Sequence, residues 1–133
     1  MIKKSVIAAL IAMSVPAASM AESIDGSVPA NRTTKVYAFT VADRSTCASP
    51  GRPKMIVSKA PQHGKVTFDW GFLPAGKGFR NCANGMMRAM AIVYTPAKGF
   101  RGVDSFSVGY SFPNMADYRS VGVKTKKFTL NVR

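Results

Sequence analysis

The chain has 133 residues, of which 47% are hydrophobic, and it carries a formal net charge of +13 at pH 7. This length corresponds to one domain and excludes a multidomain protein. The excess of basic residues predicts a positive field over much of the surface and attraction to polyanions, although charge of this kind also serves solubility alone.

The first 21 residues have the features of a secretory signal peptide. Lys3 and Lys4 precede an apolar run over residues 6–15, and Ser19 and Ala21 place small side chains where a signal peptidase cleaves. The run is about half of the roughly 20 residues needed to span a bilayer. We therefore expect cleavage after Ala21, no membrane span afterwards, and a periplasmic or secreted protein. Cleavage removes two of the 19 basic residues and none of the six acidic ones, which leaves a net charge of about +11.

Residues 22–34 are small and polar, and they predict a flexible lead-in to a domain that spans residues 35–133. Within the domain, short segments of alternating hydrophobic and polar side chains recur between turn-forming residues, which is typical of half-buried strands. In the last of them the hydrophobic positions change parity near Lys126 and Lys127, which predicts a β-bulge or a bend where the strand changes partners. These segments predict an all-β sandwich of about seven strands. They lie at residues 36–41, 54–60, 65–70, 87–95, 104–110 and 121–132.

The only two cysteines are Cys47 and Cys82. In an exported protein such a pair usually forms a disulfide. Neither cysteine has a histidine or a second cysteine at metal-ligand spacing. We therefore expect one structural disulfide, and we expect it to staple the sandwich across its middle.

Two stretches carry a recognisable motif. Residues 61–64 read P-Q-H-G, and residues 94–106 read Y-T-P-A-K-G-F-R-G-V-D-S-F. This pattern resembles the bacterial Ig-like domains of the cadherin-like tandem-repeat type, over residues 56–132. The resemblance implies an Ig-like antiparallel β-sandwich in which the motif residues serve as scaffold. These residues are Pro61, His63, Gly64, Tyr94, Pro96, Gly99, Phe100, Gly102, Asp104 and Phe106.

The motif residues have physical roles that can be anticipated. Gly64 permits a tight turn, Phe100 tucks beneath its loop, and Asp104 accepts backbone N–H bonds at a corner. Family members often occur in series and carry acidic loops that could hold calcium, whereas this chain has one copy and its loop at residues 43–53 contains one acid. Because calcium needs several oxygen ligands, we expect no metal site there.

No catalytic residues are expected. His63 is the only histidine, it falls in the family turn, and no G-x-S-x-G sequence is present. A glycosidase would need a pair of carboxylates, for which Asp69, Asp104 and Asp117 are available. In the predicted fold, however, Asp104 has a scaffold role and Asp69 lies on the polar face of a strand. The chain is therefore not expected to be an enzyme or to hold a cofactor.

The leading functional hypothesis is a binding or adhesion module that recognises an anionic polysaccharide, lipopolysaccharide or an acidic protein. The basic runs lack the interleaved aromatic residues that stack on bases, so nucleic acid is not expected as the physiological partner. The candidate contacts are Lys77, Arg80, Arg88, Lys98, Arg101, Lys124, Lys126 and Lys127.

Two other hypotheses come from different features. In the first, the protein is itself an exported inhibitor or assembly partner that docks by shape through its glycine-rich loop, Gly71–Gly85. Three methionines, Met86, Met87 and Met90, are weak candidates for binding Cu(I), although methionine more often fills a core. Trp70 continues a hydrophobic strand face and is expected in the core, while the positions of Phe72 and Phe79 are left open.

Overall fold

The computed structural model describes residues 21–113 and 121–133. The predicted signal peptide, apart from Ala21, and Asp117 lie outside these residues. No helix in the described part of the chain is long and apolar enough to cross a bilayer. The elements are β1 (Glu22–Val28), β2 (Thr34–Phe39), β3 (Lys54–Lys59), β4 (Gly64–Pro74), a short 3-10 helix (Ala83–Gly85), β5 (Met86–Pro96), β6 (Gly102–Pro113) and β7 (Val121–Val132).

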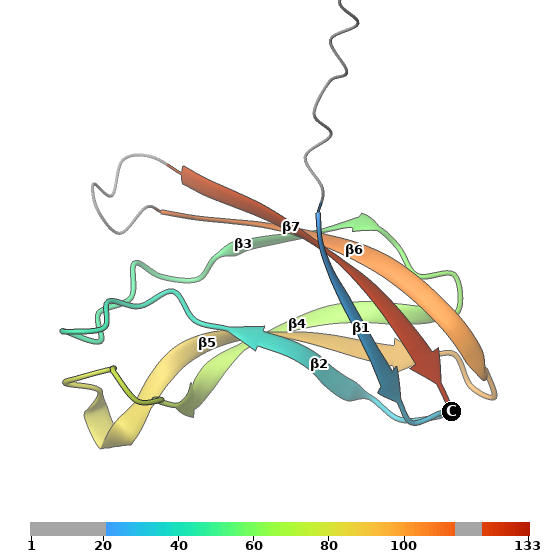
Figure 1. Cartoon of the computed structure of the whole chain (residues 1–133), viewed down its shortest axis with the longest axis horizontal. Coiled ribbons are helices and arrows are strands. Elements are labelled where there is room, and N and C mark those ends of the chain that lie inside the picture. Colours follow the sequence, from blue (N-terminus) through green and yellow to red (C-terminus); the bar gives the residue numbers. More distant parts are fainter. Residues whose placement is uncertain (1–20, 114–120) are drawn as a thin grey trace, which may run out of the picture.

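The strands form two facing sheets (Figure 1). One sheet has the order β1-β7-β6-β3 and the other has the order β2-β5-β4. β1 pairs with β7 in parallel, and the remaining pairs are antiparallel. The chain crosses from one sheet to the other after β1, β2, β3 and β5, whereas β4–β5 and β6–β7 are neighbours within one sheet. The two facing sheets form an Ig-like sandwich. The structure thus confirms the predicted fold class, with seven strands and one disulfide.

The core lies between the sheets and is rich in aromatic rings. Tyr94 from β5, Phe106 from β6 and Phe128 from β7 are fully buried. The Phe106 ring stacks on Phe128 with centroids 4.8 Å apart and lies 5.8 Å from the Tyr94 ring. Alternation along each strand sends these residues inward. Val66 and Phe68 from β4 pack against this cluster and are partly buried.

The predicted flexible lead-in is wrong for its first half, because residues 22–28 form β1. Ile24 and Val28 face the core on the same side of the strand. Gly26 between them lies against Leu130, whose side chain comes within 3.7 Å of the position that a Cβ atom would take. With small polar residues at the other positions, this alternation is weak in the sequence. The sandwich therefore begins at residue 22 rather than 35.

The predicted β-bulge near Lys126 and Lys127 is also wrong. β7 pairs with β6 without a register shift from one end to the other. Val123 points outward and is 72% exposed, whereas Lys126 occupies an inward position and is only 4% exposed. Its ammonium group bonds to the carboxylate of Glu22 and lies 4.8 Å from the Tyr37 ring centroid. A buried lysine with its own partner is thus what interrupts the hydrophobic pattern, and it is not a surface cation.

Burial opposes the charge on Lys126, but hydrogen bonds to Glu22 and Tyr37 outweigh this and raise its pKa. The hydrogen bond between Lys126 and Glu22, together with the attraction of the Lys126 ammonium charge, lowers the pKa of Glu22. Both groups therefore stay charged at neutral pH. The pair holds the start of β1 against β7.

The motif corner is a hydrogen-bonded scaffold around Asp104, as anticipated. This carboxylate is 4% exposed and accepts bonds from the backbone N–H groups of Gln62 (3.1 Å) and His63 (3.1 Å). It also accepts from the Ser105 N–H (3.0 Å) and from the Tyr94 hydroxyl (2.7 Å). The corner therefore fixes the β3–β4 connection to the start of β6 and to the end of β5.

Two further motif residues lie at this corner. The Phe100 ring stacks on His63 with a centroid separation of 4.2 Å. Gly64 is needed for a different reason from the expected turn, because its backbone is not left-handed. A Cβ atom there would sit 2.6 Å from Cε2 of Tyr94 and 2.8 Å from the Thr95 carbonyl oxygen. The glycine thus allows β4 to pass close to the buried tyrosine.

Candidate polyanion-binding site

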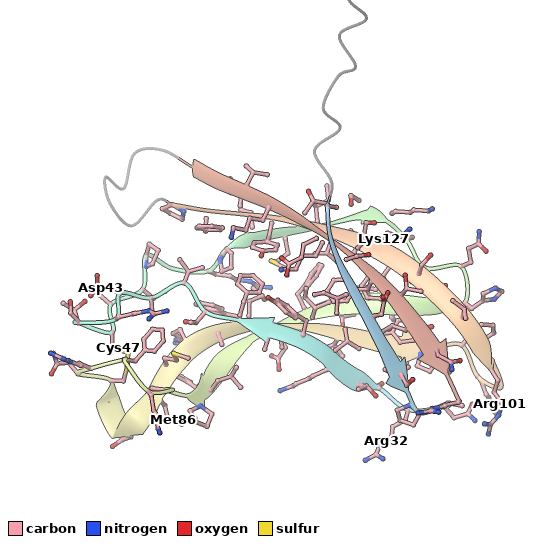
Figure 2. The ribbon with its side chains drawn as sticks, in the orientation of Figure 1. Arg32, Asp43, Cys47, Met86, Arg101 and Lys127 are labelled. Carbon is pink, nitrogen blue, oxygen red and sulfur yellow. A yellow bond between two sulfur atoms is a disulfide. The ribbon has the colours of Figure 1, made fainter. Side chains whose placement is uncertain are left out.

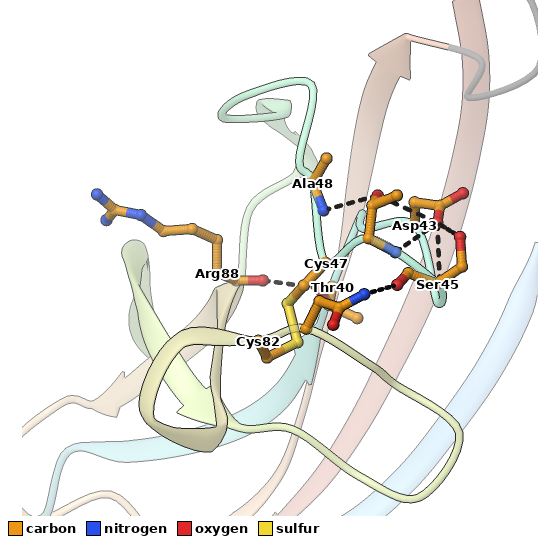
Figure 3. Close-up of a disulfide and its surroundings, with 9 residues drawn as sticks. Thr40, Asp43, Ser45, Cys47, Ala48, Cys82 and Arg88 are labelled. Atoms are coloured by element: carbon orange, nitrogen blue, oxygen red, sulfur yellow. Dashed lines mark hydrogen bonds between the residues drawn. A yellow bond between two sulfur atoms is a disulfide. The ribbon is translucent and has the colours of Figure 1, made fainter.

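The disulfide joins two loops at one end of the sandwich. Cys47 lies in the β2–β3 loop, residues 40–53, and Cys82 lies in the β4–β5 loop, residues 75–85, with their Cα atoms 5.1 Å apart. The expectation of a staple across the middle was therefore wrong, because both cysteines lie beyond the ends of the paired strands (Figures 2 and 3). We call residues 40–53 and 75–85, together with Arg88 at the adjoining start of β5, the clamped loop end. Gly71–Pro74, which we had assigned to the second loop, belong to β4.

Hydrogen bonds join the two loops beside the disulfide. The Arg80 N–H donates to the Arg44 carbonyl (2.7 Å), and the Asn81 side-chain amide donates to the Ser45 carbonyl (2.7 Å). Cys47 adopts φ +60°, a left-handed conformation that non-glycine residues keep only where surrounding contacts fix it. The Thr40 hydroxyl donates to the Arg88 carbonyl (2.6 Å), which ties the loops to β5. The loops thus form one ordered unit.

Asp43 is the only acidic residue of the clamped loop end, and it serves the loop itself. Its Oδ1 accepts bonds from the backbone N–H groups of Ser45 (2.8 Å) and Thr46 (2.9 Å). The hydrogen bond from the Ser45 hydroxyl and these backbone bonds lower the pKa of Asp43 to about 2. Its backbone N–H also donates to the Ala48 carbonyl (2.9 Å). The carboxylate is therefore turned toward its own backbone.

The cations of this end are exposed. The loops contribute Arg44, Arg52, Lys77 and Arg80, and Arg88 follows at the start of β5. The side chain of Arg88 extends away from the disulfide (Figure 3). This end therefore carries five basic side chains and one carboxylate, which is bonded to its own loop. The excess of positive charge makes this end strongly positive.

Aromatic rings lie beside two of these cations. The Arg88 guanidinium is 4.2 Å from the Phe72 ring centroid and 5.8 Å from that of Trp70. The Arg44 guanidinium is 5.7 Å from the Phe79 centroid. Phe72 is 58% exposed, and Trp70, which we expected in the core, is only partly buried. The site therefore places the guanidinium groups of Arg44 and Arg88 beside aromatic rings. These cation–π contacts hold the two arginines in place.

The eight candidate contacts predicted from the sequence do not form one surface. Lys77, Arg80 and Arg88 belong to the clamped loop end. Lys98 and Arg101 lie in the β5–β6 turn at the opposite end, which Figure 2 shows near Arg32 and the C-terminus. The remaining three are on β7, where Lys124 and Lys127 are exposed and Lys126 is buried.

The sequence analysis missed Arg44 and Arg52 as partners of the other loop cations. They are more than 25 residues away from Arg80 in the chain, and the two loops meet only in the folded protein, where the disulfide and the hydrogen bonds of Arg80 and Asn81 join them. The predicted cysteine pair was the signal that could have found them. A search for cations flanking each cysteine would have grouped both loops.

The methionines do not converge on a copper site. Met86, Met87 and Met90 all lie in β5, where alternation sends Met87 to the face opposite the other two. Met86 and Met90 are separated by four residues, roughly 13 Å along a strand, and Met90 is fully buried. In the described part of the chain, no group of three or more His, Cys, Asp and Glu side chains could hold a metal ion.

The chain was compared with known proteins at three levels. No family model, no curated protein and no solved structure matches it.

Proposed function

We propose that this protein is an exported, non-enzymatic binding module that recognises an anionic polysaccharide or lipopolysaccharide of the cell envelope through the clamped loop end. The observation that carries the proposal is the set of five exposed cations at one end of the sandwich, four on the two loops that the Cys47–Cys82 disulfide joins and one at the start of β5, with one carboxylate bonded to its own loop. Phosphate, sulfate and carboxylate groups are the complementary ligands.

The order of the loops supports binding. A flexible loop loses conformational freedom when it grips a ligand, and this loss reduces affinity. The disulfide and the hydrogen bonds of Arg80 and Asn81 remove much of that freedom in advance. The exposed ring of Phe72 beside Arg88 offers a face for a sugar ring next to a cation for its acidic substituent.

The opposite end is a less suitable site, although it also carries exposed cations such as Arg32, Lys98 and Arg101. Its connections are tight turns that bond to each other, for example the Gly99 N–H to the Asn31 side-chain oxygen (2.7 Å). No disulfide and no arginine–aromatic pair orders cations there among the described residues. Loops that cluster at one end of an Ig-like sandwich are also where such domains commonly bind.

Export is part of the proposal. The N-terminal segment has the composition of a signal peptide, and a disulfide is typical of proteins in oxidising compartments. We further propose membership of the bacterial Ig-like domains of the cadherin-like tandem-repeat type. The network around Asp104 supports this, because it gives the Y-x-P-x-x-G-F-x-G-x-D motif a physical role.

The experiment compares two double variants with the same change in charge. Arg44→Gln with Arg80→Gln removes two cations from the clamped loop end, and Arg32→Gln with Arg101→Gln removes two from the opposite end. Binding of purified lipopolysaccharide would be measured by fluorescence anisotropy at low salt. At roughly 1 kcal/mol per cation near an anionic surface, we expect the first pair to weaken binding roughly 10- to 30-fold.

The matched pair should lose far less affinity, because it changes only the long-range field. Wild-type affinity should fall steeply as salt rises from about 0.01 M to 0.15 M, where the screening length shrinks from about 30 Å to about 8 Å. Equal losses in both variants would contradict a local site. Docking of a folded partner by shape would instead survive both variants and fail when residues 75–85 are shortened.

A further inference from the structure

The outer face of the four-stranded sheet contains a hollow that the proposed polyanion site does not use. It measures about 310 Å³, near the lower end of the range of about 300–1,000 Å³ that small-molecule pockets occupy. Residues from three neighbouring strands line it: Ile56 from β3, Gly109 and Ser111 from β6, and Val123 from β7. The lining is mainly apolar.

Gly109 makes the floor of this hollow. It lies within β6, opposite Ile56 on one side and Thr125 on the other, and the register shift of the β3–β6 pair falls on β3, between Val57 and Lys59. Its backbone is not left-handed, so neither a turn nor a bulge accounts for a glycine here. A glycine inside a strand often marks a place where a ligand approaches closely. Here the missing side chain leaves a groove between two neighbouring walls.

The walls are unusually exposed for branched apolar residues. Ile56 is 64% exposed and Val123 is 72% exposed, and both point outward on either side of β6. In water these side chains gain nothing from exposure, whereas an alkyl chain laid between them would bury apolar area on both partners. The groove therefore favours an extended apolar segment over a polar ligand.

Positive charge borders the groove. Lys54 lines it and also lines an adjacent hollow of about 200 Å³ together with Arg52, Phe112 and Pro113. Among the described residues of β3, β6 and β7 the only carboxylate is Asp104, which is buried and bonded in the motif corner. An anionic head group is therefore the complementary one.

We propose that this groove binds a monomeric single-chain anionic amphiphile, with the alkyl chain between Ile56 and Val123 over Gly109 and the anionic head group at Lys54. A second copy of this chain is disfavoured, because it would bring a second positively charged surface against Lys54. The groove contains none of the cations of the clamped loop end, although Arg52 lines the adjacent hollow. Its variants leave Arg44, Arg52 and Arg80 unchanged.

The test titrates the full mature protein with octyl, decyl and dodecyl phosphate, each below its micelle concentration, by calorimetry. A fully buried methylene contributes roughly fourfold in affinity, so two added methylenes in an open groove should tighten binding about fourfold or more. Dodecyl maltoside, which has a neutral head group, should bind more weakly. Ile56→Ser and Val123→Ser should each weaken dodecyl phosphate binding about fivefold or more.

The matched control is Val103→Ser. Val103 is 65% exposed on the outer face of the same sheet, but it lies outside the groove. It should leave binding unchanged. Gly109→Ala places a methyl group 3.1 Å from Cγ2 of Ile56, an exposed side chain that can move, so this variant should fold and bind more weakly. Arg44→Gln with Arg80→Gln should keep the affinity for dodecyl phosphate, which separates this proposal from the polyanion site.

Three results would overturn the proposal. The first is affinity that does not depend on chain length, since this would show that only the head group binds. The second is an equal loss for Val103→Ser and Ile56→Ser. The third is binding to anionic vesicles without binding to the monomers, which would indicate a membrane surface rather than a single amphiphile.

Discussion

Replacing Asp104 by asparagine tests the hydrogen-bonded corner that fixes the β3–β4 connection to β5 and β6. The carboxylate receives four hydrogen bonds, two at each oxygen. An amide has the same shape but only one acceptor oxygen, so two of the four donors lose their acceptor whichever way the amide sits. Hydrogen bonds to a charged group contribute about 1.5–3 kcal/mol each, and one unpaired donor, the Tyr94 hydroxyl, can turn to accept from the amide. We expect a loss of about 2–4 kcal/mol in the free energy of unfolding.

Urea unfolding followed by the fluorescence of Trp70, the only tryptophan, measures this loss. The midpoint should fall while the dependence on urea concentration stays the same, since the folded state keeps its surface. Tyr94→Phe removes one of the four bonds and should cost about 1–2 kcal/mol. The double variant should lose less than the sum, because both changes remove the same contact. A cost below about 0.5 kcal/mol for Asp104→Asn, or strict additivity, would refute the role given to this corner.

Three further predictions concern other parts of the fold. Replacing Cys47 and Cys82 by serine should lower the free energy of unfolding by about 4 kcal/mol, because the disulfide closes a loop with a separation of 35 residues. The same variant should bind the polyanion more weakly. Thermal unfolding measures the first effect, and fluorescence anisotropy measures the second. Gly64→Ala should cost about 1–3 kcal/mol because the methyl group meets the buried tyrosine ring, whereas Gly71→Ala, which meets nothing within 4 Å, should be close to neutral in the same urea assay. Since the pKa of Asp43 is lowered from 3.8 to about 2, its ionised form stabilises the fold above pH 4 and this contribution disappears as the pH falls through 2. The melting temperature of wild type should therefore exceed that of Asp43→Asn above pH 4 and converge with it near pH 2, and a constant difference would contradict the assignment.

Much of the fold could be predicted because alternation is a local property. The segments around Val66, Phe106 and Leu130 show it clearly, and all three became strands. β1 was missed because only Ile24 and Val28 carry its hydrophobic face and glycine sits between them. Its pairing with β7 is a long-range contact that no local pattern encodes.

Lys126 was misjudged for a related reason. A lysine in a sequence is assigned to the surface by default, and here its partner Glu22 is 104 residues away. Because position 126 lacks an apolar side chain, the sequence pattern suggested a bulge in the strand. A buried lysine that is paired with an exposed carboxylate breaks the hydrophobic pattern without breaking the strand.

The candidate site was only partly accessible from the sequence. Lys77, Arg80 and Arg88 could be named because they flank a glycine-rich loop beside Cys82. Arg44 joins them only through the disulfide and the bond from Arg80 to its carbonyl. Residue type and chain position predict which groups can bind an anion, but the tertiary fold decides which of them act together.

The most direct test of the proposed site is to map the polyanion on the protein itself. Backbone amide signals of the labelled mature protein would be followed by NMR during titration with lipopolysaccharide-derived oligosaccharide that carries its phosphates. We predict that the largest shifts fall at Arg44, Arg80 and Arg88 and grow smaller along the strands. Shifts centred on Arg32 and Arg101, or spread evenly over the surface, would contradict a binding site at the clamped loop end.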